Sequence, residues 1–348
     1  MEHRKLGATG ISVSPLCLGA MMFGSWGNTD HDDSVAIIHT ALDAGINFID
    51  TADVYSRGES EEIVGKALSG GRRDSVVLAT KAHGRMHDTD PNAFGNSRRW
   101  LVKEVEESLR RLKTDWIDLY QIHRPEPDTD IDQTLGALSD LIAAGKIRAI
   151  GSSTFPAWQI VEAQWVAERR GRQRFMCEQP PYSMLIRAIE RDVLPACEQF
   201  GMGVIPWSPL AGGWLSGRYT KGGESPGSSR RAQMIPSRYD MSIPGNQAKL
   251  AAAEKLHELA EQAGISLIEM SIRFVTSHRA VTAAIIGPRT MEQLESQLAA
   301  LEQPVLPGEL LDRIDEVVPP GTNVNQADTG WDPPWLTDPA LRRRPAGA

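Results

Sequence analysis

The chain has few cysteines, no long apolar run and fewer basic than acidic residues, and each shortage excludes a class of protein. Cys17, Cys177 and Cys197 stand far apart with no CxxC pair, which favours reduced packing residues over disulfides, a redox dithiol or a metal site. No uninterrupted apolar stretch is long enough to cross a bilayer, and Met1–Lys5 leads into no apolar signal segment. We therefore expect a soluble, cytoplasmic protein without a membrane partner.

The charge balance also limits the kind of partner. The formal net charge is −8, whereas a protein that follows a nucleic-acid backbone needs a basic surface to displace counterions. A small-molecule partner is the better expectation. No feature of the sequence indicates an oligomeric state.

Apolar β-type runs alternate with amphipathic helical runs along most of the chain, which is typical of a parallel sheet crossed over by helices. A short hairpin is expected first, around Gly7 to Gly10. The predicted strands are 15–19, 47–51, 76–81, 117–123, 147–153, 175–179, 203–208 and 282–287. The predicted helices are 33–44, 60–68, 98–112, 131–144, 157–170, 189–200, 247–264, 266–277 and 290–301.

Eight alternations predict an α/β fold, a (β/α)8 TIM barrel with an N-terminal β-hairpin. The main alternative is a doubly wound open sheet with a second domain, but no linker divides the chain, so residues 1–348 are expected to form one domain. Two polar stretches, 84–97 and 211–245, follow strand ends and are expected as long loops on the C-terminal face. From about residue 318 the chain is expected to form an irregular tail.

Chemistry-bearing side chains follow three successive predicted strands: Asp50 and Tyr55 after the second, Lys81 at the end of the third and His123 at the end of the fourth. In a (β/α)8 barrel these strand ends meet at one mouth. A nearby cation stabilises a phenolate, so Lys81 can make a tyrosine a better acid, and Asp50 can hold the lysine charge. With His123 orienting a carbonyl oxygen, the set suits proton delivery as a hydride reaches the carbon.

Two alternatives stay open at this point. Asp53, two residues before Tyr55, competes with Asp50 for the role of lysine partner. Lys81 is also a possible Schiff-base nucleophile of a barrel lyase or aldolase.

The chain resembles the aldo-keto reductase family from about Leu6 to Leu301. The motifs that carry the resemblance stand in the family's order: Asn47–Ala52 with Tyr55, Thr80–Lys81, Asp118–Tyr120 with His123, Gly151–Phe155, Gln179 with Tyr182, Trp207–Leu210 with Gly212, and Ile285–Gly287 with Gln293. The resemblance implies an NADPH-preferring enzyme with Asp50, Tyr55, Lys81 and His123 as catalytic tetrad and Tyr55 as general acid.

The same resemblance implies that Ser153 and Gln179 hold the nicotinamide carboxamide and that Trp207 stacks on its ring. Thr154 stands where many relatives carry Asn, and its hydroxyl can still bond the amide. The sequence lacks the G-x-G-x-x-G fingerprint after a strand, so the phosphates must be held in another way.

The expected phosphate sites are two glycine-containing segments. The pyrophosphate cradle is assigned to Ser208, Leu210, Gly212, Ser216 and Arg218. After the last strand, Gly287 and Arg289 open a helix whose N-terminus favours an anion, and Arg289 is suited to a 2′-phosphate, which predicts NADPH or NADP. Gln293 and Gln297, one turn apart, are expected near the adenine. The simpler structural interpretation of helix 290–301 is an ordinary N-terminal capping box followed by a buried apolar face, and both interpretations can hold together.

The expected substrate is a small aldehyde or ketone, with Trp26 and His83 proposed as pocket walls from their positions. The alternative function is that of a nicotinamide-cofactor-binding regulatory subunit with little turnover, since potassium-channel β-subunits share the resemblance. Slow turnover with every aldehyde would favour that alternative.

Overall fold

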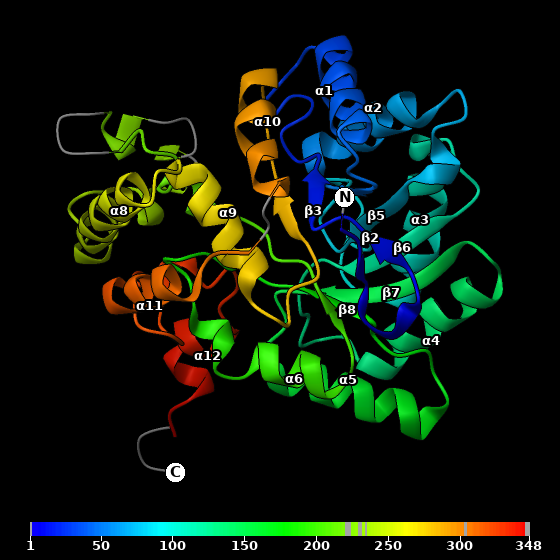
Figure 1. The fold of residues 1–348 in the computed structure, drawn as a ribbon. Coiled ribbons are helices and arrows are strands. Elements are labelled where there is room, and N and C mark those ends of the chain that lie inside the picture. The colour runs from blue at the N-terminus through cyan, green and yellow to red at the C-terminus, as the bar shows by residue number, and fades with distance from the viewer. Residues whose placement is uncertain (1, 220–223, 229–231, 234, 303–304, 345–348) are drawn as a thin grey trace.

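The chain forms a parallel β-barrel surrounded by helices (Figure 1). The structure, a computed structural model, describes residues 2–219, 224–228, 232–233, 235–302 and 305–344. Within these residues eight parallel strands pair in the order β10-β3-β4-β5-β6-β7-β8-β9. They are β3 (Leu16–Gly19), β4 (Phe48–Asp50), β5 (Val77–Ala82), β6 (Ile117–Ile122), β7 (Ile147–Ser153), β8 (Cys177–Gln179), β9 (Gly203–Val204) and β10 (Ala284–Ile286).

The two edge strands of this order meet and close the barrel. Val204 of β9 forms a parallel bridge with Val281, just before β10. The backbone N–H of Ile285 then donates to the carbonyl of Pro206 over 2.9 Å. The predicted (β/α)8 fold is confirmed.

One helix or helix pair follows each strand, and the helices surround the barrel; in the pair after β9 the first helix packs on the second. These helices are α1 (His31–Asp43), α2 (Glu59–Leu68), α3 (Arg98–Leu112), α4 (Ile131–Ala143), α5 (Ala157–Arg170), α6 (Val193–Gln199), α8 (Pro244–Gln262) with α9 (Leu267–Ser277), and α10 (Met291–Leu298). The polar side chains of Asp30, Ser97, Asp130, Ser266 and Thr290 cap backbone amides at helix N-termini, which explains why those helices begin there.

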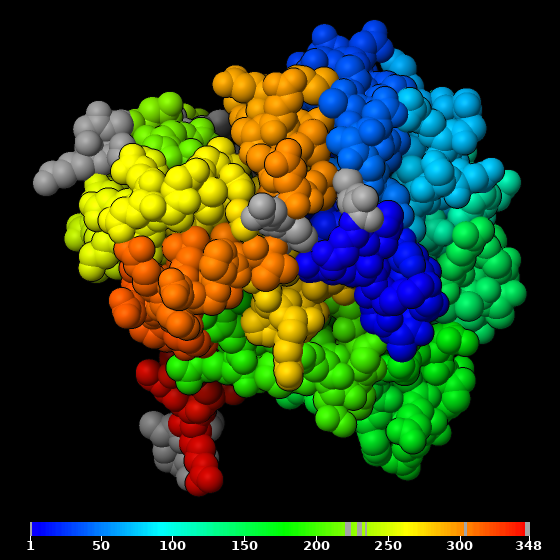
Figure 2. Space-filling view, viewed as in Figure 1, coloured from blue at the N-terminus to red at the C-terminus, as the bar shows by residue number. Residues whose placement is uncertain are grey.

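The N-terminal hairpin covers the bottom of the barrel. Its strands β1 (Arg4–Lys5) and β2 (Ser12–Val13) pair antiparallel, and Leu6 and Val13 are buried against the barrel interior. Gly7 has a φ of +52°, and a Cβ there would lie 2.4 Å from the backbone nitrogen of Gly203, so only glycine fits. Figure 2 shows the hairpin, in dark blue, on the face in view.

The sequence did not predict the helix before the tail. Helix α11 (Gly308–Val317) was missed, although Leu310 and Ile314 face the core at helical spacing. The tail after residue 318 is anchored to the rest of the protein, since Val324 N–H donates to the carbonyl of Leu185, and its longest helix is the short α12 (Pro334–Thr337) among the described residues. In the predicted loop 211–245, residues 220–223, 229–231 and 234 lie outside the described residues.

Candidate active site

The positions of the predicted site residues follow from the alternation of side chains along the barrel strands. Side chains on one face of a strand recur every second residue, and the inner face of this barrel is filled by one apolar layer. That layer includes Phe48, Ala79, Leu119, Ala149, Cys177 and Ile205. The residue two positions further along each strand therefore faces the same interior one layer higher, at the C-terminal mouth: Asp50, Lys81, Gln121, Gly151, Gln179 and Trp207.

Lys81 is the centre of this upper layer and is fully buried. Its Nζ donates to Oδ1 of Asp50 over 2.5 Å, to the carbonyl of Thr51 over 2.8 Å and to the phenol oxygen of Tyr55 over 3.2 Å. Burial lowers the pKa of Lys81, but Asp50 and Tyr55 outweigh burial and raise it above its ordinary value. Lys81 is therefore a charged ammonium with its three donors engaged, which argues against a Schiff-base nucleophile.

Asp50 carries the charge that balances Lys81, and two amides hold its second oxygen. Gln121 Nε2 donates to Oδ2 over 3.0 Å, and Gln179 Nε2 donates to the same oxygen over 2.9 Å. The role of Gln121 was missed in the sequence, although its alternation with Leu119 points it inward. Three donors on one buried carboxylate fix its position.

Asp53, the sequence alternative to Asp50, does not contact Lys81 through its side chain. Its Oδ1 accepts from the N–H of Val54 over 2.6 Å, and Oδ2 is buried without a hydrogen-bond partner among the described residues. Burial, reinforced by Glu104 and Glu61, raises the pKa of Asp53 well above its ordinary value. Asp53 is thus a buried acid whose environment favours the protonated form, and it lies outside the lysine network.

Tyr55 begins a short turn that directs its ring into the mouth. Ser56 and Arg57 follow with φ values of +49° and +57°, a left-handed conformation that is uncommon for side chains of this kind. The Tyr55 ring lies edge-on to His123 with centroids 5.6 Å apart, and Trp26 lies 5.9 Å away on another side. The structure therefore brings together Asp50, Lys81, Tyr55 and His123, with Trp26 beside them.

His123 is electrostatically biased toward its neutral form. Burial lowers its pKa well below the ordinary value, and the cations Arg124 and Lys81 and the nearby His83 act in the same direction. His83 itself lies at the loop entrance, where its Nδ1 lies 2.9 Å from Oδ1 of Asn96, and burial lowers its pKa as well. A neutral imidazole keeps one N–H donor for a carbonyl oxygen.

The residues assigned to the nicotinamide gather on the adjacent strands. Ser153 Oγ donates to the carbonyl of Gln179 over 2.9 Å, and the two strand ends are thereby joined. Gln179 uses its nitrogen on Asp50 and Gln121, and its oxygen accepts from no residue in the described part of the chain. Thr154 has a φ of +61°, and a Cβ on Gly330 would lie 3.2 Å from its Cγ2 and 2.8 Å from the indole of Trp207, so the C-terminal segment lies over both residues.

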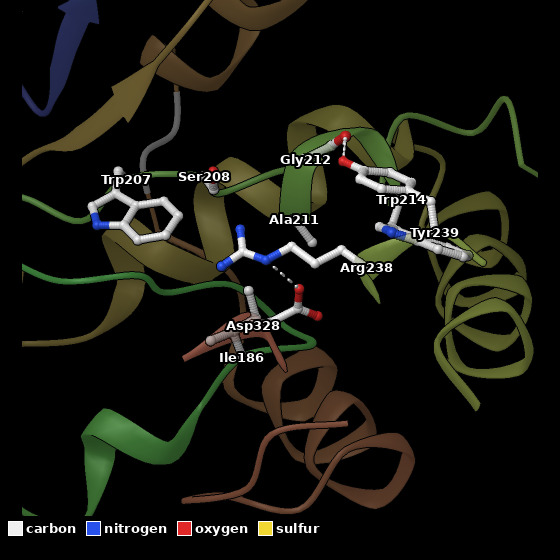
Figure 3. A pocket seen from close by; sticks show the side chains of 9 residues that line it. All are labelled: Ile186, Trp207, Ser208, Ala211, Gly212, Trp214, Arg238, Tyr239 and Asp328. Carbon is white, nitrogen blue, oxygen red and sulfur yellow. Dashed lines mark hydrogen bonds and ion pairs between the residues drawn. The ribbon is translucent and has the colours of Figure 1, made fainter. Parts of the chain in front are cut away.

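A pocket opens beside Trp207 (Figure 3). The guanidinium of Arg238, from the long loop, extends between Trp207, Ser208 and Asp328 (Figure 3). Its Nε lies 3.4 Å from Oδ1 of Asp328, whose other oxygen accepts from Lys249 over 2.9 Å. Arg238, Lys249 and Asp328 come from a loop, a helix and the tail, so no pattern in the sequence indicates that they meet.

The wall of this pocket is a turn with unpaired amides. Ser208, Ala211 and Gly212 have φ values of +59°, +49° and +69°. The backbone N–H groups of Ser208, Leu210 and Gly212 donate to no other residue in the described part of the chain. Such a run of outward amides forms an anion-binding concavity, so this turn fits a pyrophosphate. Further along, Ser216 accepts from Nε of Arg218 over 3.1 Å at the exposed end.

The second predicted phosphate site lies after β10. A Cβ on Gly287 would meet no atom within 4 Å, so the space above it is open. The exposed Arg289 forms no ion pair with a described residue, and its backbone N–H donates to Oε1 of Gln293 over 2.8 Å. Gln297 is buried, and its Oε1 has no partner among the described residues. An unpaired guanidinium and an orphaned amide oxygen beside a helix N-terminus fit the phosphate and base of a nucleotide.

Comparison with known proteins agrees with this geometry. The model of the Aldo/keto reductase family matches residues 15–319. A protein of Bacillus subtilis named uncharacterized oxidoreductase YrpG is 38% identical over 94% of this chain and 99% of its own. A versiconal hemiacetal acetate reductase of Aspergillus parasiticus is 33% identical over 89% and 95% of the two chains. A probable voltage-gated potassium channel subunit beta of Oryza sativa is 35% identical over 91% and 97%.

The chain belongs to the aldo/keto reductase family, an oxidoreductase family built on the barrel described above. No helix in the described part of the chain has the length and apolar content to span a membrane.

Proposed function

We propose that this protein uses NADPH to reduce an aldehyde or ketone to an alcohol, with Tyr55 as the proton donor. The observation that carries the proposal is the contact of 3.2 Å between the Tyr55 phenol oxygen and the Lys81 ammonium, itself held by Asp50. A buried cation at this distance stabilises the phenolate that remains after the proton has left.

The cofactor, when bound, supplies the hydride. Ser153, Thr154 and Gln179 would hold its carboxamide, Trp207 would lie against its ring, and the turn at Ser208, Leu210 and Gly212 with Arg218 would hold its pyrophosphate. Gly287 and Arg289 would receive the 2′-phosphate, with Gln293 and Gln297 near the base. The outward amides and the unpaired Arg289 support this assignment.

The chain's own groups then act on the carbonyl oxygen. Neutral His123 donates a hydrogen bond that orients the oxygen, while Trp26 and His83 wall the mouth. Tyr55 transfers its proton to the oxygen as negative charge develops there, and Lys81 stabilises the phenolate. Asp50, fixed by Gln121 and Gln179, keeps Lys81 charged through the cycle.

The test is the loss of absorbance of NADPH with 4-nitrobenzaldehyde, repeated with NADH and with Tyr55→Phe. We expect turnover with NADPH and a loss of at least about 100-fold in kcat for Tyr55→Phe, with NADPH still bound. Undiminished turnover in Tyr55→Phe would contradict the proposed role of Tyr55 as the proton donor.

Relatives named potassium channel β-subunits favour one second function, a cofactor-binding regulatory subunit. On that reading NADPH fluorescence is quenched on binding but no carbonyl compound is reduced at a useful rate. The assay above separates the two functions, because binding and turnover are measured on the same protein.

A further inference from the structure

Arg124, the residue after His123, places a guanidinium at the mouth of the barrel. The side chain is partly exposed, and its Nη1 donates to the carbonyl of His123 over 2.5 Å and lies 3.5 Å from Oγ of Ser153. The guanidinium is thereby anchored at the ends of β6 and β7, between the proposed proton donor and the residues assigned to the nicotinamide.

The charge of Arg124 has no counterion in the described part of the chain. No carboxylate lies within 4.0 Å of it, whereas the buried arginines Arg111, Arg187 and Arg273 each have one. Burial lowers the pKa of Arg124, the direction expected for a cation removed from water without a partner. A partly desolvated cation without a counterion is costly, so it indicates a partner that arrives from outside.

The free donors of Arg124 have a specific geometry. Both contacts use Nη1, so Nε and Nη2 donate to no described residue. These two nitrogens form one edge of the guanidinium, and their parallel N–H bonds match the two oxygens of a carboxylate.

Neither nearby carboxylates nor the expected cofactor would occupy that edge. Glu178 is fully buried and accepts from Ser152 Oγ and the N–H of Phe155. Glu126 accepts from the N–H of Asn96 and the hydroxyl of Thr129. The proposed phosphate sites lie at the turn after β9 and after β10, whereas Arg124 follows β6, and the carboxamide expected at Ser153 is uncharged.

We infer that Arg124 binds a carboxylate of the substrate, so that the preferred substrate is an aldehyde or ketone carrying an acid group a short distance from its carbonyl. The inference rests on the proposed reductase function and names its substrate class. The second guanidinium at the mouth, Arg238, strengthens the positive field, because its partner Asp328 is shared with Lys249 and the three groups carry one net positive charge.

The test compares 4-carboxybenzaldehyde with its methyl ester, since the two share the reacting aldehyde and differ in the charge at the far end. For the wild type we expect kcat/KM to be about 10- to 100-fold higher for the acid. This factor corresponds to the free-energy contribution of a partly buried, charge-assisted pair of hydrogen bonds. Arg124→Met is expected to abolish this preference, and Arg124→Lys to keep part of it because the charge remains without the planar edge. Arg169→Met is the matched control, since Arg169 is an exposed arginine over Trp165 on α5.

Three results would overturn the inference. The first is a wild type that reduces acid and ester equally, and the second is an Arg169 variant that loses the preference as fully as the Arg124 variant. The third is an Arg124 variant that loses the same factor for both substrates, which would assign the guanidinium to the reacting oxygen instead. In each case reduction of the ester shows that the proposed function stands; a protein that binds NADPH but reduces neither compound contradicts the function itself.

Discussion

Asp50 and Lys81, 31 residues apart in the chain, form a buried ion pair of 2.5 Å across neighbouring strands β4 and β5. Their side chains are 2% and 0% exposed, so water cannot replace either partner. The pair holds the positive charge beside Tyr55. It also makes the fold sensitive to mutation, because removing either partner leaves the other charge buried and unpaired.

We expect Asp50→Asn to lower the free energy of unfolding by about 3–5 kcal/mol, since it leaves the Lys81 charge buried and unpaired. The double variant Asp50→Asn, Lys81→Met should recover much of that loss, because both charges are then gone. Urea unfolding followed by circular dichroism measures the difference. Equal stability of the single and double variants would mean that the two charges do not depend on each other.

His123 should show no titration near the ordinary histidine pKa of about 6.5. The pKa of His123 is lowered in the folded protein. Between that lowered pKa and 6.5 the unfolded chain binds a proton on His123 that the folded protein does not, so the free energy of unfolding falls as the pH drops through this window. The NMR chemical shift of the His123 ring, assigned with His123→Asn, should stay that of a neutral imidazole at pH 6. Half-protonation at pH 6.5 would contradict the neutral donor role.

Glu178 should make the protein less stable as the pH rises. Burial raises the pKa of Glu178 to about 7, so between its ordinary value and 7 the folded state keeps a proton that the unfolded state has lost. The stability contribution therefore declines across that window, by roughly 1–3 kcal/mol. Glu178→Gln retains the contacts to Ser152 and Phe155 and should flatten this part of the curve of unfolding free energy against pH; an unchanged curve would place the carboxyl in a wetter site.

Arg289→Ala should raise the KM for NADPH by about 10- to 100-fold and leave that for NADH nearly unchanged, since only NADPH carries the 2′-phosphate. Arg279→Ala is the control, because Arg279 flanks the opposite end of β10 and pairs with Glu198. A similar rise with both cofactors would move Arg289 away from the 2′-phosphate.

Gly330→Ala should weaken NADPH binding several-fold. This loss should be larger than the accompanying fall in melting temperature would explain. The new Cβ would lie 2.8 Å from the indole of Trp207, so the ring or the tail must shift. Gly308→Ala adds a methyl group with no atom within 4 Å and serves as control. A fluorescence titration measures the Kd of each variant for NADPH. Equal Kd values for the two variants would mean that the tail at Gly330 does not contribute to the cofactor site.

The sequence by itself determined the element order and the upper layer of the barrel. Because strand side chains alternate with a period of two, Phe48, Ala79 and Cys177 in the interior already imply that Asp50, Lys81 and Gln179 face the same mouth. The proposed catalytic groups could be expected at one mouth since they stand at or just after strand ends in chain order. Helix α11 had a readable period as well, but it lies beyond the repeating units and was missed.

The tertiary structure alone decided which neighbours these groups have. Distances between strands and the closure of the barrel assign Lys81 to Asp50 rather than Asp53 and bring Gln121 onto Asp50. They also leave one edge of Arg124 without a counterion among the described residues. The tail over Trp207 and the shared Asp328 likewise depend on contacts between segments about 80 or more residues apart. Local periodicity fixes which way a side chain points, whereas charge pairing depends on separations of a few ångströms that only the packed chain sets.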